Sequence, residues 1–435
     1  MIKLVGGKWR NWSGGVKCRP RRVLAPSNEI ELAAAIRISE GPIRAVGSGH
    51  SFTPIAASDG ELLDLAAFAG LKNISFEFER ATFFAATPLW AIGPALHPHG
   101  FALNNMGDID RQTLAGAVAT ATHGTGSMLR CDSAYLSGFR LILADGSVLN
   151  CSAEDNVDIF QAGRVALGTL GVMTEITLSV RPHYRLTEND FLLPSDELFE
   201  RLDELVADNR HFEFFWFAFS DTAVCKSLNE TERPAPVPAG AETMRRRGAC
   251  HGLEERVFAG LNEALPYLPF LARPVHGLFS RVMPRPARAR WSHEVFPSAR
   301  PVRFDEMEYA LPSARGADCL RELVTEIRKK RLVTGFPLEF RTVAADDIPL
   351  SPFFERDSAT IAVHQFHKVD PTALFAACEA IFRNHGGRPH WAKRHSRTRD
   401  DLATLYPGYE RFCALRRSLD PRGKFLNPYL RALFE

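Results

Sequence analysis

The sequence lacks the features that assign many proteins to a class at once. Its 435 residues include only eight cysteines, which form no C-x-x-C pair and no zinc-ligand spacing. No stretch reaches the roughly 18 apolar residues that a membrane-spanning helix needs, and the first fifteen residues hold no apolar core of a secretory signal. Repeats and low-complexity segments are absent too. We therefore expect a cytoplasmic enzyme with free thiols and no integral membrane segment.

An excess of charge of one sign is also missing. The formal net charge is +2, which argues against a nucleic-acid partner for the chain as a whole, and we interpret the basic run MRRRG (244–248) as a solvated loop. With 45% hydrophobic and 24% charged residues, the composition is that of an ordinary globular protein. Since single cores stop growing near roughly 250–300 residues, the length predicts two domains.

The third glycine of a dinucleotide-binding fingerprint is missing as well. In IRAVGSGHSFTP (43–54), Gly47 and Gly49 are followed by Phe52 where the pattern G-x-G-x-x-G requires glycine. The Thr-Pro pair that comes next prevents a regular helix from beginning at the expected place, which excludes a Rossmann site for NAD. The two glycines can still let backbone N–H groups converge on an anion, and a plain surface turn is the alternative.

A second unusual stretch is DIDRQTLAGAVATATHGTG (108–126), in which Ala, Gly and Thr fill nearly every position after Leu114. Small residues in series let the backbone lie against an extended ligand, while threonine hydroxyls and free N–H groups bind it. A tightly packed helix or strand crossing is the alternative. Two such loops, about one supersecondary unit apart, suggest the two ends of one long ligand.

Hydrophobic periodicity predicts two units of mixed structure. A helix is expected over 27–40 and a strand over 43–46, and Asp145-Gly146 predicts a hairpin turn, so the first 182 residues form an α+β unit rich in short strands. After that, broad strands alternate with amphipathic helices, which favours a second α+β unit with an antiparallel sheet. We expect 229–299 to be loops and helices over this sheet, and 409–430 to be one helix broken at an Asp-Pro pair.

Six motifs occur in order along the chain: VGSGHSF, TLAGAVATATHGTG, LGTLGVMTEITLSVRP, LEFRTVAADD, GRPHWAK and DPRGKFLNPYL. Together they resemble the vanillyl-alcohol-oxidase superfamily of PCMH-type FAD-binding flavoproteins, and within it the branch of sugar-1,4-lactone oxidases and alditol oxidases. The resemblance runs nearly end to end and is weakest over 229–299. It implies an α+β fold with a PCMH-type FAD-binding domain at 1–182 and a cap or substrate domain at 183–410, built on a large antiparallel sheet flanked by helices. A C-terminal segment, 411–435, is expected to return to the FAD-binding domain.

The resemblance implies that FAD lies against three loops. In that family the first loop cradles the pyrophosphate, and the histidine after its second glycine, here His50, commonly bonds covalently to the 8α-methyl group of the flavin. A histidine that only hydrogen-bonds the loop is the alternative. The residues carried over to FAD binding at these loops are Val46, Gly47, Ser48, Gly49, His50, Ser51, Thr113, Gly116, Thr120, Ala121, Thr122, His123, Gly124, Gly126, Gly171 and Val172.

Two further positions match sites beside the flavin in relatives, and we expect them to contact FAD. Gly107 stands where an alanine hinders oxygen in some relatives, so the missing Cβ implies room for O2 and favours an oxidase. Asp108 departs from the serine that is frequent there, so hydrogen bonding near that edge is expected to differ from the alditol oxidases.

The resemblance places the catalytic residues in the second domain. Glu339 and Arg341 stand two apart in LEFRTV, so on a strand they share a face, although such a pair alone is more often a surface ion pair. Lys393 is expected at the same site, together with His364, which stands where alditol oxidases have threonine. Arg341 and Lys393 are the expected stabilisers of a developing alkoxide. Lys393 or His364 is the expected proton acceptor, since a lysine beside an arginine in a partly dry pocket loses its proton more easily.

The histidines of RNHGGRPHWAKRHS (383–396) can be read as metal ligands, but no carboxylate or cysteine stands at ligand spacing, so we expect no metal. The sequence thus predicts an FAD-dependent oxidase. It would move hydride from a CH–OH group of a sugar-1,4-lactone, or a related small polyhydroxylated substrate, to flavin N5 and reduce O2 to H2O2. An alditol oxidase, or a dehydrogenase with a quinone or protein acceptor, is the alternative of the same chemistry. A non-catalytic flavin-binding module is the alternative from another class.

Overall fold

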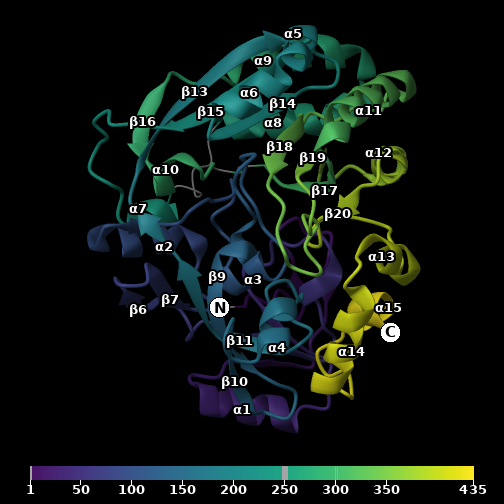
Figure 1. The fold of residues 1–435 in the computed structure, drawn as a ribbon. Helices are drawn as coiled ribbons and strands as arrows, with labels where there is room; N and C mark the ends of the chain where they lie inside the picture. The colour runs from purple at the N-terminus through teal and green to yellow at the C-terminus, as the bar shows by residue number, and fades with distance from the viewer. Residues whose placement is uncertain (1, 247–252, 299, 301) are drawn as a thin grey trace.

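The structure is a computed structural model that describes residues 2–246, 253–298, 300 and 302–435. Strands from the first 182 residues form the lower part of the molecule in Figure 1, and strands from Arg185 onward form one large sheet in the upper part. The predicted mixture of α and β structure is confirmed. Part of the basic run at 244–248 and Cys250 lie outside the described residues, and the other seven cysteines are buried and unpaired.

The lower part begins with a parallel three-stranded sheet whose order is β3-β5-β4. A helix connects β3 to β4, as the sequence predicted, because Asn28 caps it by accepting the Glu31 N–H at 3.0 Å and its apolar face buries Leu32 and Ile36. No α-helix follows β4, where the described chain makes only a 3-10 turn at Pro54–Ala56. The bounds are β3 Arg22–Leu24, α1 Glu29–Ile38, β4 Ile43–Val46 and β5 Glu61–Asp64.

A second, antiparallel sheet of the lower part has the order β10-β9-β11-β7-β6. Its hairpin turns at Asp145-Gly146, where Gly146 has φ +84, and this confirms the predicted turn. Two pairs of short strands and three helices complete this part. The bounds are β1 Trp9–Arg10, β2 Lys17–Cys18, β6 Leu71–Ser75, β7 Arg80–Phe84, α2 Leu89–Leu96, β8 Phe101–Ala102, α3 Leu114–Val118, β9 Leu136–Ile142, β10 Val148–Ser152, α4 Val157–Gly163, β11 Val172–Ser179 and β12 Arg181–Pro182.

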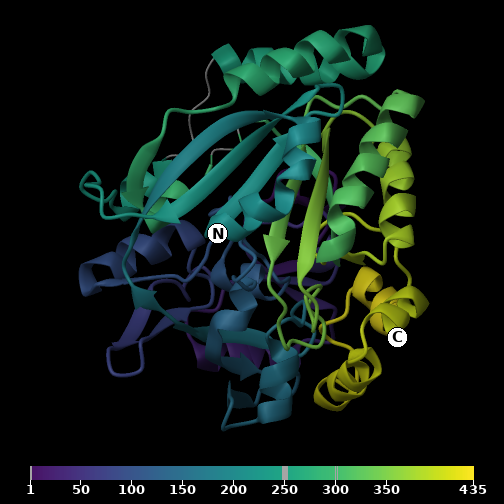
Figure 2. The same ribbon diagram turned by 45° about the horizontal axis from the view of Figure 1, so that its top comes forward.

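The upper part is an eight-stranded sheet in the order β16-β13-β15-β14-β18-β19-β17-β20, with every pairing antiparallel. Four helices cover one face (Figures 1 and 2), where Phe214 and Phe340 stack with ring centroids 4.8 Å apart inside the core. The predicted antiparallel sheet is confirmed. The strands are β13 Arg185–Pro194, β14 His211–Trp216, β15 Thr222–Glu230, β16 Arg288–Trp291, β17 Phe304–Pro312, β18 Leu338–Val343, β19 Ser358–Phe366 and β20 Arg388–Pro389. The helices are α5 Ser195–Glu200, α6 Leu202–Asp208, α11 Gly316–Lys330 and α12 Thr372–Asn384.

The segment 229–299 supplies helices that lie over this sheet, as expected, but it also contains an edge strand, β16, that the sequence did not indicate. Its four residues are only half-buried, so its hydrophobic pattern is weak. Helix α8 lies by β19 and α9 by β15, and the pair forms the top of the molecule in Figure 2. The helices are α7 Ala241–Arg246, α8 Leu253–Ala264, α9 Ala272–Val282 and α10 Ser292–Val295. No helix in the described part of the chain is long and apolar enough to cross a membrane.

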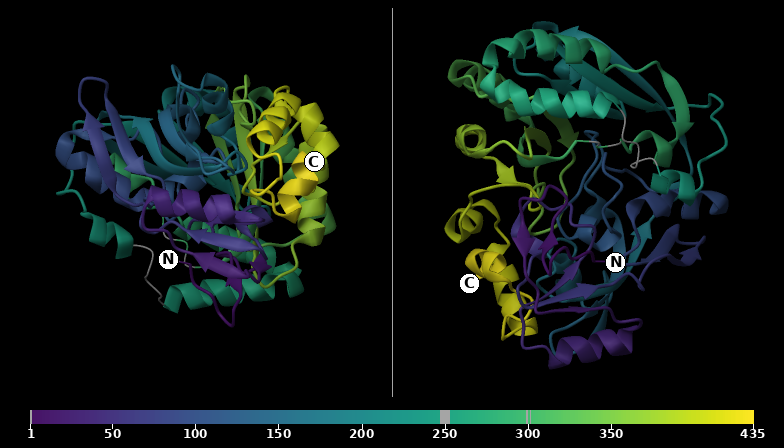
Figure 3. Two further views of the ribbon diagram at one scale, coloured as in Figure 1. Left: turned by 90° about the horizontal axis from the view of Figure 1, so that it is seen from below. Right: turned by 180° about the vertical axis from the view of Figure 1, so that it is seen from behind.

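The C-terminal segment packs against the lower part, which Figure 3 shows from below and behind. Lys424 Nζ donates to the carbonyl oxygens of Ile36, Arg37 and Ala144 at 2.9 to 3.0 Å, and Arg44 donates to the Phe425 carbonyl at 2.6 Å. The predicted single broken helix is in fact two helices separated by a loop. The last helices are α13 Arg399–Leu405, α14 Tyr409–Leu419 and α15 Pro428–Phe434.

Candidate active site

A first cavity lies in the lower part among β4, α3 and the start of β11. Phe425 of the C-terminal segment also lines it. Small residues dominate the wall, which leaves room for a ligand to lie along the backbone. Eleven of the residues predicted to bind FAD line this cavity: Val46, Gly47, Ser48, Gly49, His50, Ser51, Thr113, Gly116, Thr120, Gly171 and Val172.

The glycine loop at 47–51 is built to hold an anion. The backbone N–H groups of residues 48–51 donate to no group of the described chain, so four donors stay available. Gly47 has to lack a side chain, because a Cβ there would lie 2.4 Å from Thr113 Oγ1, the group that caps α3. Gly49 has φ +72, a conformation that favours glycine. These features fit the pyrophosphate of FAD and make a plain surface turn the poorer interpretation.

Three residues of the second predicted FAD loop lie away from the walls of the described cavities. Ala121 is fully buried in the core, with φ +57. A Cβ at Gly124 would lie 2.3 Å from the Met106 carbonyl oxygen, and Gly126 forms an isolated bridge with Val343. The small side chains at these positions are thus explained by close packing of the chain itself.

His50 lies where the cofactor cavity meets a second, polar cavity, because it lines both. Its ring stacks on the indole of Trp12, with centroids 5.6 Å apart. Burial, reinforced by the charges of Lys393 and Arg111, lowers the pKa of His50 to about 4. The imidazole is therefore neutral at physiological pH and keeps a nitrogen lone pair.

The polar cavity, which we call the catalytic pocket, contains all four residues predicted to be catalytic. Its walls come from β17, β18 and β19 of the large sheet and from the loops at 107–112 and 390–393. Besides His50, the predicted residues that line it are Gly107, Asp108, Thr122, His123, Glu339, Arg341, His364 and Lys393. The structure thus brings residues far apart in sequence to one site beside the cofactor cavity.

Arg341 is surrounded by three carboxylates. Its guanidinium pairs with Glu339, as their spacing predicted, and also with Glu213 at 2.7 Å and Asp108 at 2.8 Å. Burial lowers the pKa of Arg341, but the three carboxylates outweigh it and raise the pKa well above its ordinary value. Burial keeps the pKa of Glu339 raised in spite of Arg341. Arg341 is therefore a fixed positive charge held in place from three sides.

Lys393 and His364 share a carboxylate that the sequence analysis did not single out. Glu306 Oε2 lies 2.5 Å from Lys393 Nζ, and Glu306 Oε1 lies 3.6 Å from His364 Nε2. Burial alone would raise the pKa of Glu306, but Lys393 and His364 lower it to about 2. A second carboxylate oxygen, Glu308 Oε2, lies 4.0 Å from Lys393 Nζ. Arg341 lines the same pocket, and the expectation that a neighbouring arginine makes Lys393 a base stays a prediction.

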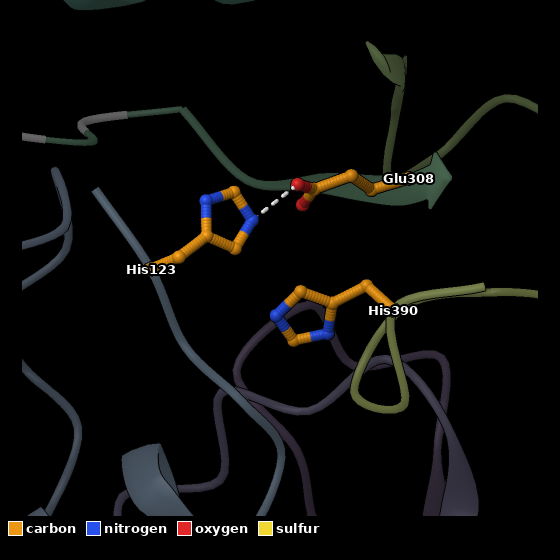
Figure 4. A group of neighbouring side chains, drawn as sticks. All are labelled: His123, Glu308 and His390. Atoms are coloured by element: carbon orange, nitrogen blue, oxygen red, sulfur yellow. Dashed lines mark hydrogen bonds and ion pairs between the residues drawn. The ribbon is translucent and has the colours of Figure 1, made fainter. Parts of the chain in front are cut away.

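Figure 4 shows a buried group of two histidines and one carboxylate in the same pocket. His123 Nε2 lies 2.7 Å from Glu308 Oε1, and His390 lies beside them, with ligand atoms of the three within 4.8 Å of one another. Burial lowers the pKa of His390 to about 4, although Glu308 opposes it. The sequence analysis found no carboxylate near His390 because Glu308 comes from a distant strand. Its Oε1 is already engaged by His123, so we interpret the group as a hydrogen-bonded support for the pocket floor.

Several charged residues of the site escaped the sequence analysis. Glu306 and Glu308 alternate on β17, where every residue but the last is buried, and carboxylates in such a strand were the signal that could have found them. Lys226 Nζ lies 3.0 Å from Glu213 Oε1, and Arg300 donates to Asp108 at 2.8 Å. The pocket and its surroundings therefore hold several ion pairs of buried negative and positive groups.

Gly107 lines the catalytic pocket, but its missing Cβ has a reason within the chain. A Cβ there would lie 3.0 Å from the carbonyl oxygen of His123 and 3.6 Å from Thr122 Cγ2. The glycine thus permits close approach of two loops. The expectation that it makes room for O2 stays a prediction.

Comparison with known proteins agrees with this geometry. The family model described as D-arabinono-1,4-lactone oxidase matches residues 176–433, and the one described as FAD binding domain matches residues 20–152. The L-gulono-1,4-lactone dehydrogenase of Mycobacterium tuberculosis is 37% identical over 97% of this chain and 98% of its own. The L-gulonolactone oxidase of Bos taurus is 31% identical over 99% and 98%, and the alditol oxidase of a Streptomyces species is 28% identical over 98% of both chains.

Among solved structures, the cholesterol oxidase of B. sterolicum aligns with a TM-score of 0.84 over 99% of this chain and 97% of its own, at 15% identity. That likeness establishes the PCMH-type FAD fold alone. The loops, the two adjoining cavities and the sequence matches together define an FAD-linked oxidoreductase. The chain belongs to the D-arabinono-1,4-lactone oxidase family.

Proposed function

We propose that the protein oxidises a CH–OH group of a sugar-1,4-lactone, or of a related small polyhydroxylated substrate, with O2 as acceptor and H2O2 as product. Bound FAD supplies the redox chemistry by accepting hydride at N5. The observation that supports the proposal best is the catalytic pocket itself, in which buried carboxylates alternate with cations beside the cofactor cavity. A polyhydroxylated substrate offers several hydroxyl donors and acceptors at once, and such a lining can engage many of them.

His364 is the proton acceptor that the geometry favours. Its Nδ1 lies 3.3 Å from the carbonyl oxygen of Pro337, which can only accept, so in the neutral ring the proton sits on Nδ1 and Nε2 offers a lone pair. Glu306 at 3.6 Å and Glu339 at 4.0 Å lie on the Nε2 side. These two carboxylates stabilise the imidazolium that forms when the substrate hydroxyl gives up its proton.

Arg341 and Lys393 stabilise the developing alkoxide. Both side chains are mostly buried, with 11% and 14% exposed, so their charges act through little water. The carboxylates around them fix their positions before substrate arrives, which avoids reorganisation during the reaction. His50, Gly107 and Asp108 complete the wall beside the cofactor cavity.

An alditol oxidase, or a dehydrogenase with another acceptor, is the second function that specific observations favour. The relatives are named as a dehydrogenase, an oxidase and an alditol oxidase, so they support the oxidation of lactones or polyols more strongly than any one acceptor. The seven described cysteines, buried and unpaired, support the cytoplasm as the expected compartment.

A substrate screen tests the proposal. Holoenzyme is mixed with aldono-1,4-lactones and with alditols, and turnover is followed both by peroxide release in air and by an artificial acceptor under argon. We expect lactones to reduce the flavin and peroxide to form. His364→Gln should slow anaerobic flavin reduction, while His99→Gln, an exposed position, should not. If no lactone or polyol reduces the flavin, the chain is a binding module and the proposal fails.

We also propose that His50 is bonded covalently to the flavin. Its neutral imidazole at the junction of the two cavities supports this, because the free nitrogen is the nucleophile that such a bond needs. After acid precipitation the flavin should stay with the polypeptide, and it should be released from His50→Ala. Complete release from the unmodified protein would contradict the covalent bond and leave the fold and the reaction unaffected.

A further inference from the structure

A third cavity, of about 330 Å³, adjoins the catalytic pocket, and we call it the apolar chamber. Four residues line both cavities, which places the inner end of the chamber at the catalytic residues: Arg300, Phe304, Glu339 and His364. The remaining wall comes from the end of β14 and the segment after it, from helices α8 and α9, and from residues 283, 302, 336 and 337. A passage therefore leads from the site of hydride removal toward the two helices at the top of Figure 2.

The apolar chamber has a mostly hydrophobic lining, whereas charged side chains line much of the catalytic pocket. Away from the four shared residues, its lining side chains are phenylalanine, valine, methionine and proline, including Phe217 of the segment after β14 and Phe279 of α9. These side chains can replace few of the hydrogen bonds that a hydroxyl group gives up on leaving water, so a fully hydroxylated ligand binds here at a cost. An alkyl or aryl group, by contrast, gains from burial.

The chamber opens at the C-terminal end of α9. Val282 lines it and yet is 67% exposed, so the cavity reaches the surface beside this side chain. Leu278, one turn earlier, is 55% exposed and lies outside the lining. Val282 thus places an apolar side chain at the mouth. The apolar lining continues inward to Phe304, which packs edge-on against His364 with ring centroids 4.9 Å apart.

We propose that the substrate is amphiphilic, with a polyhydroxylated head oxidised in the catalytic pocket and an apolar alkyl or aryl substituent held in the apolar chamber. The proposal rests on the proposed function for the head. It goes beyond that function because free sugar lactones or alditols would leave an aromatic chamber of this size unused. Phe304, which lines both cavities, marks the junction between the two parts of such a ligand.

The test uses a series of 1,2-alkanediols of increasing chain length, which carry a small hydroxylated head and a growing tail. Their dissociation constants are measured by calorimetry on the dithionite-reduced holoenzyme under argon, which cannot oxidise them, and kcat and KM are measured with an artificial acceptor. Each added methylene should tighten binding by about fourfold until the chamber is full, as expected for burial of one CH2, and kcat should change little. Because binding is read directly, failure of the proposed oxidation does not affect this result.

Two matched variants, one within α9 and one at its C-cap, locate the effect. Met283→Trp fills the chamber, since Met283 lines it, and should abolish the dependence of binding on tail length. Leu278→Trp adds the same bulk outside the lining and should keep that dependence. Leu278→Trp should leave kcat/KM for the shortest substrates unchanged, because Leu278 lines neither the catalytic pocket nor the apolar chamber.

The proposal is overturned if the dissociation constants of the diols do not depend on tail length, or if Met283→Trp leaves that dependence intact. It is also overturned if an apolar tail improves turnover only when the electron acceptor, and not the substrate, carries that tail. A benzoquinone acceptor with and without a decyl chain separates this case, because a gain for the decyl form alone, lost in Met283→Trp, assigns the chamber to the acceptor.

Discussion

The buried ion pair between Lys393 and Glu306 predicts how the variant Lys393→Met changes both stability and flavin reduction. Lys393→Met keeps the length of the side chain and removes its charge, which leaves Glu306, only 5% exposed, without the partner that lies 2.5 Å away. Removing one partner of a buried pair costs about 3–5 kcal/mol, a large part of a typical total stability of about 5–15 kcal/mol. Loss of one stabilising charge at the reacting oxygen should slow flavin reduction by about 10²–10³-fold.

The pH dependence of stability gives this variant a signature. In the unmodified protein Glu306 has its pKa lowered to about 2, so its contribution is present above its unfolded pKa and is lost as the pH falls toward 2. Without Lys393, burial becomes the main influence and raises the folded pKa above the unfolded one. Ionised Glu306 then destabilises the folded state, so the variant should lose more stability at pH 8 than at pH 5.

The double variant Lys393→Met with Glu306→Gln separates stability from chemistry. It removes both charges, so it should recover much of the melting temperature and lose the reversed pH dependence, while flavin reduction stays slow. Thermal melts at pH 5 and pH 8 and anaerobic stopped-flow reduction measure the two effects. An unchanged reduction rate in the single variant would remove Lys393 from the mechanism. Equal destabilisation of the single and double variants would show that Glu306 is not the residue left unpaired.

Three further predictions concern the cofactor cavity and the proton acceptor. Gly47→Ala should lower the ratio of flavin to protein, because its Cβ would lie 2.4 Å from Thr113 Oγ1, and Thr113→Ala in the same chain should recover part of it. His50→Ala should release all flavin on acid precipitation while a catalytic pocket able to bind substrate persists, as calorimetry would show. His364→Gln should lower kcat/KM by about 10²–10⁴-fold, the usual contribution of a general base, and a smaller effect would assign the proton to another acceptor.

The cofactor loops could be predicted from the sequence because they are local. Glycines and small residues that follow one another, such as those at 47–49, indicate directly where the backbone takes an unusual conformation and where no side chain can fit. The motif order then gave the fold and the position of the large sheet. The pairing of Glu339 with Arg341 could also be predicted, since residues two apart on one strand share a face whichever strands lie beside them.

The rest of the pocket depends on which strands are neighbours and in which register. Glu306 stands directly opposite His364, and Glu213 opposite Arg341, so these partners meet only through the pairing of the large sheet. A one-residue shift would turn each of them to the other face. Nothing local to a single strand fixes that register, which is why Glu306 and Glu213 could not be predicted from the sequence.

The attachment of the C-terminal segment bears on the order of events during biosynthesis. Phe425 lines the cofactor cavity, its carbonyl accepts from Arg44 of β4, and Lys424 ties the same turn to the end of α1. A nascent chain that has emerged only as far as the large sheet therefore still lacks one wall of that cavity. The binding site for FAD is therefore complete only after translation has passed residue 425, when all strands of the large sheet have been synthesised.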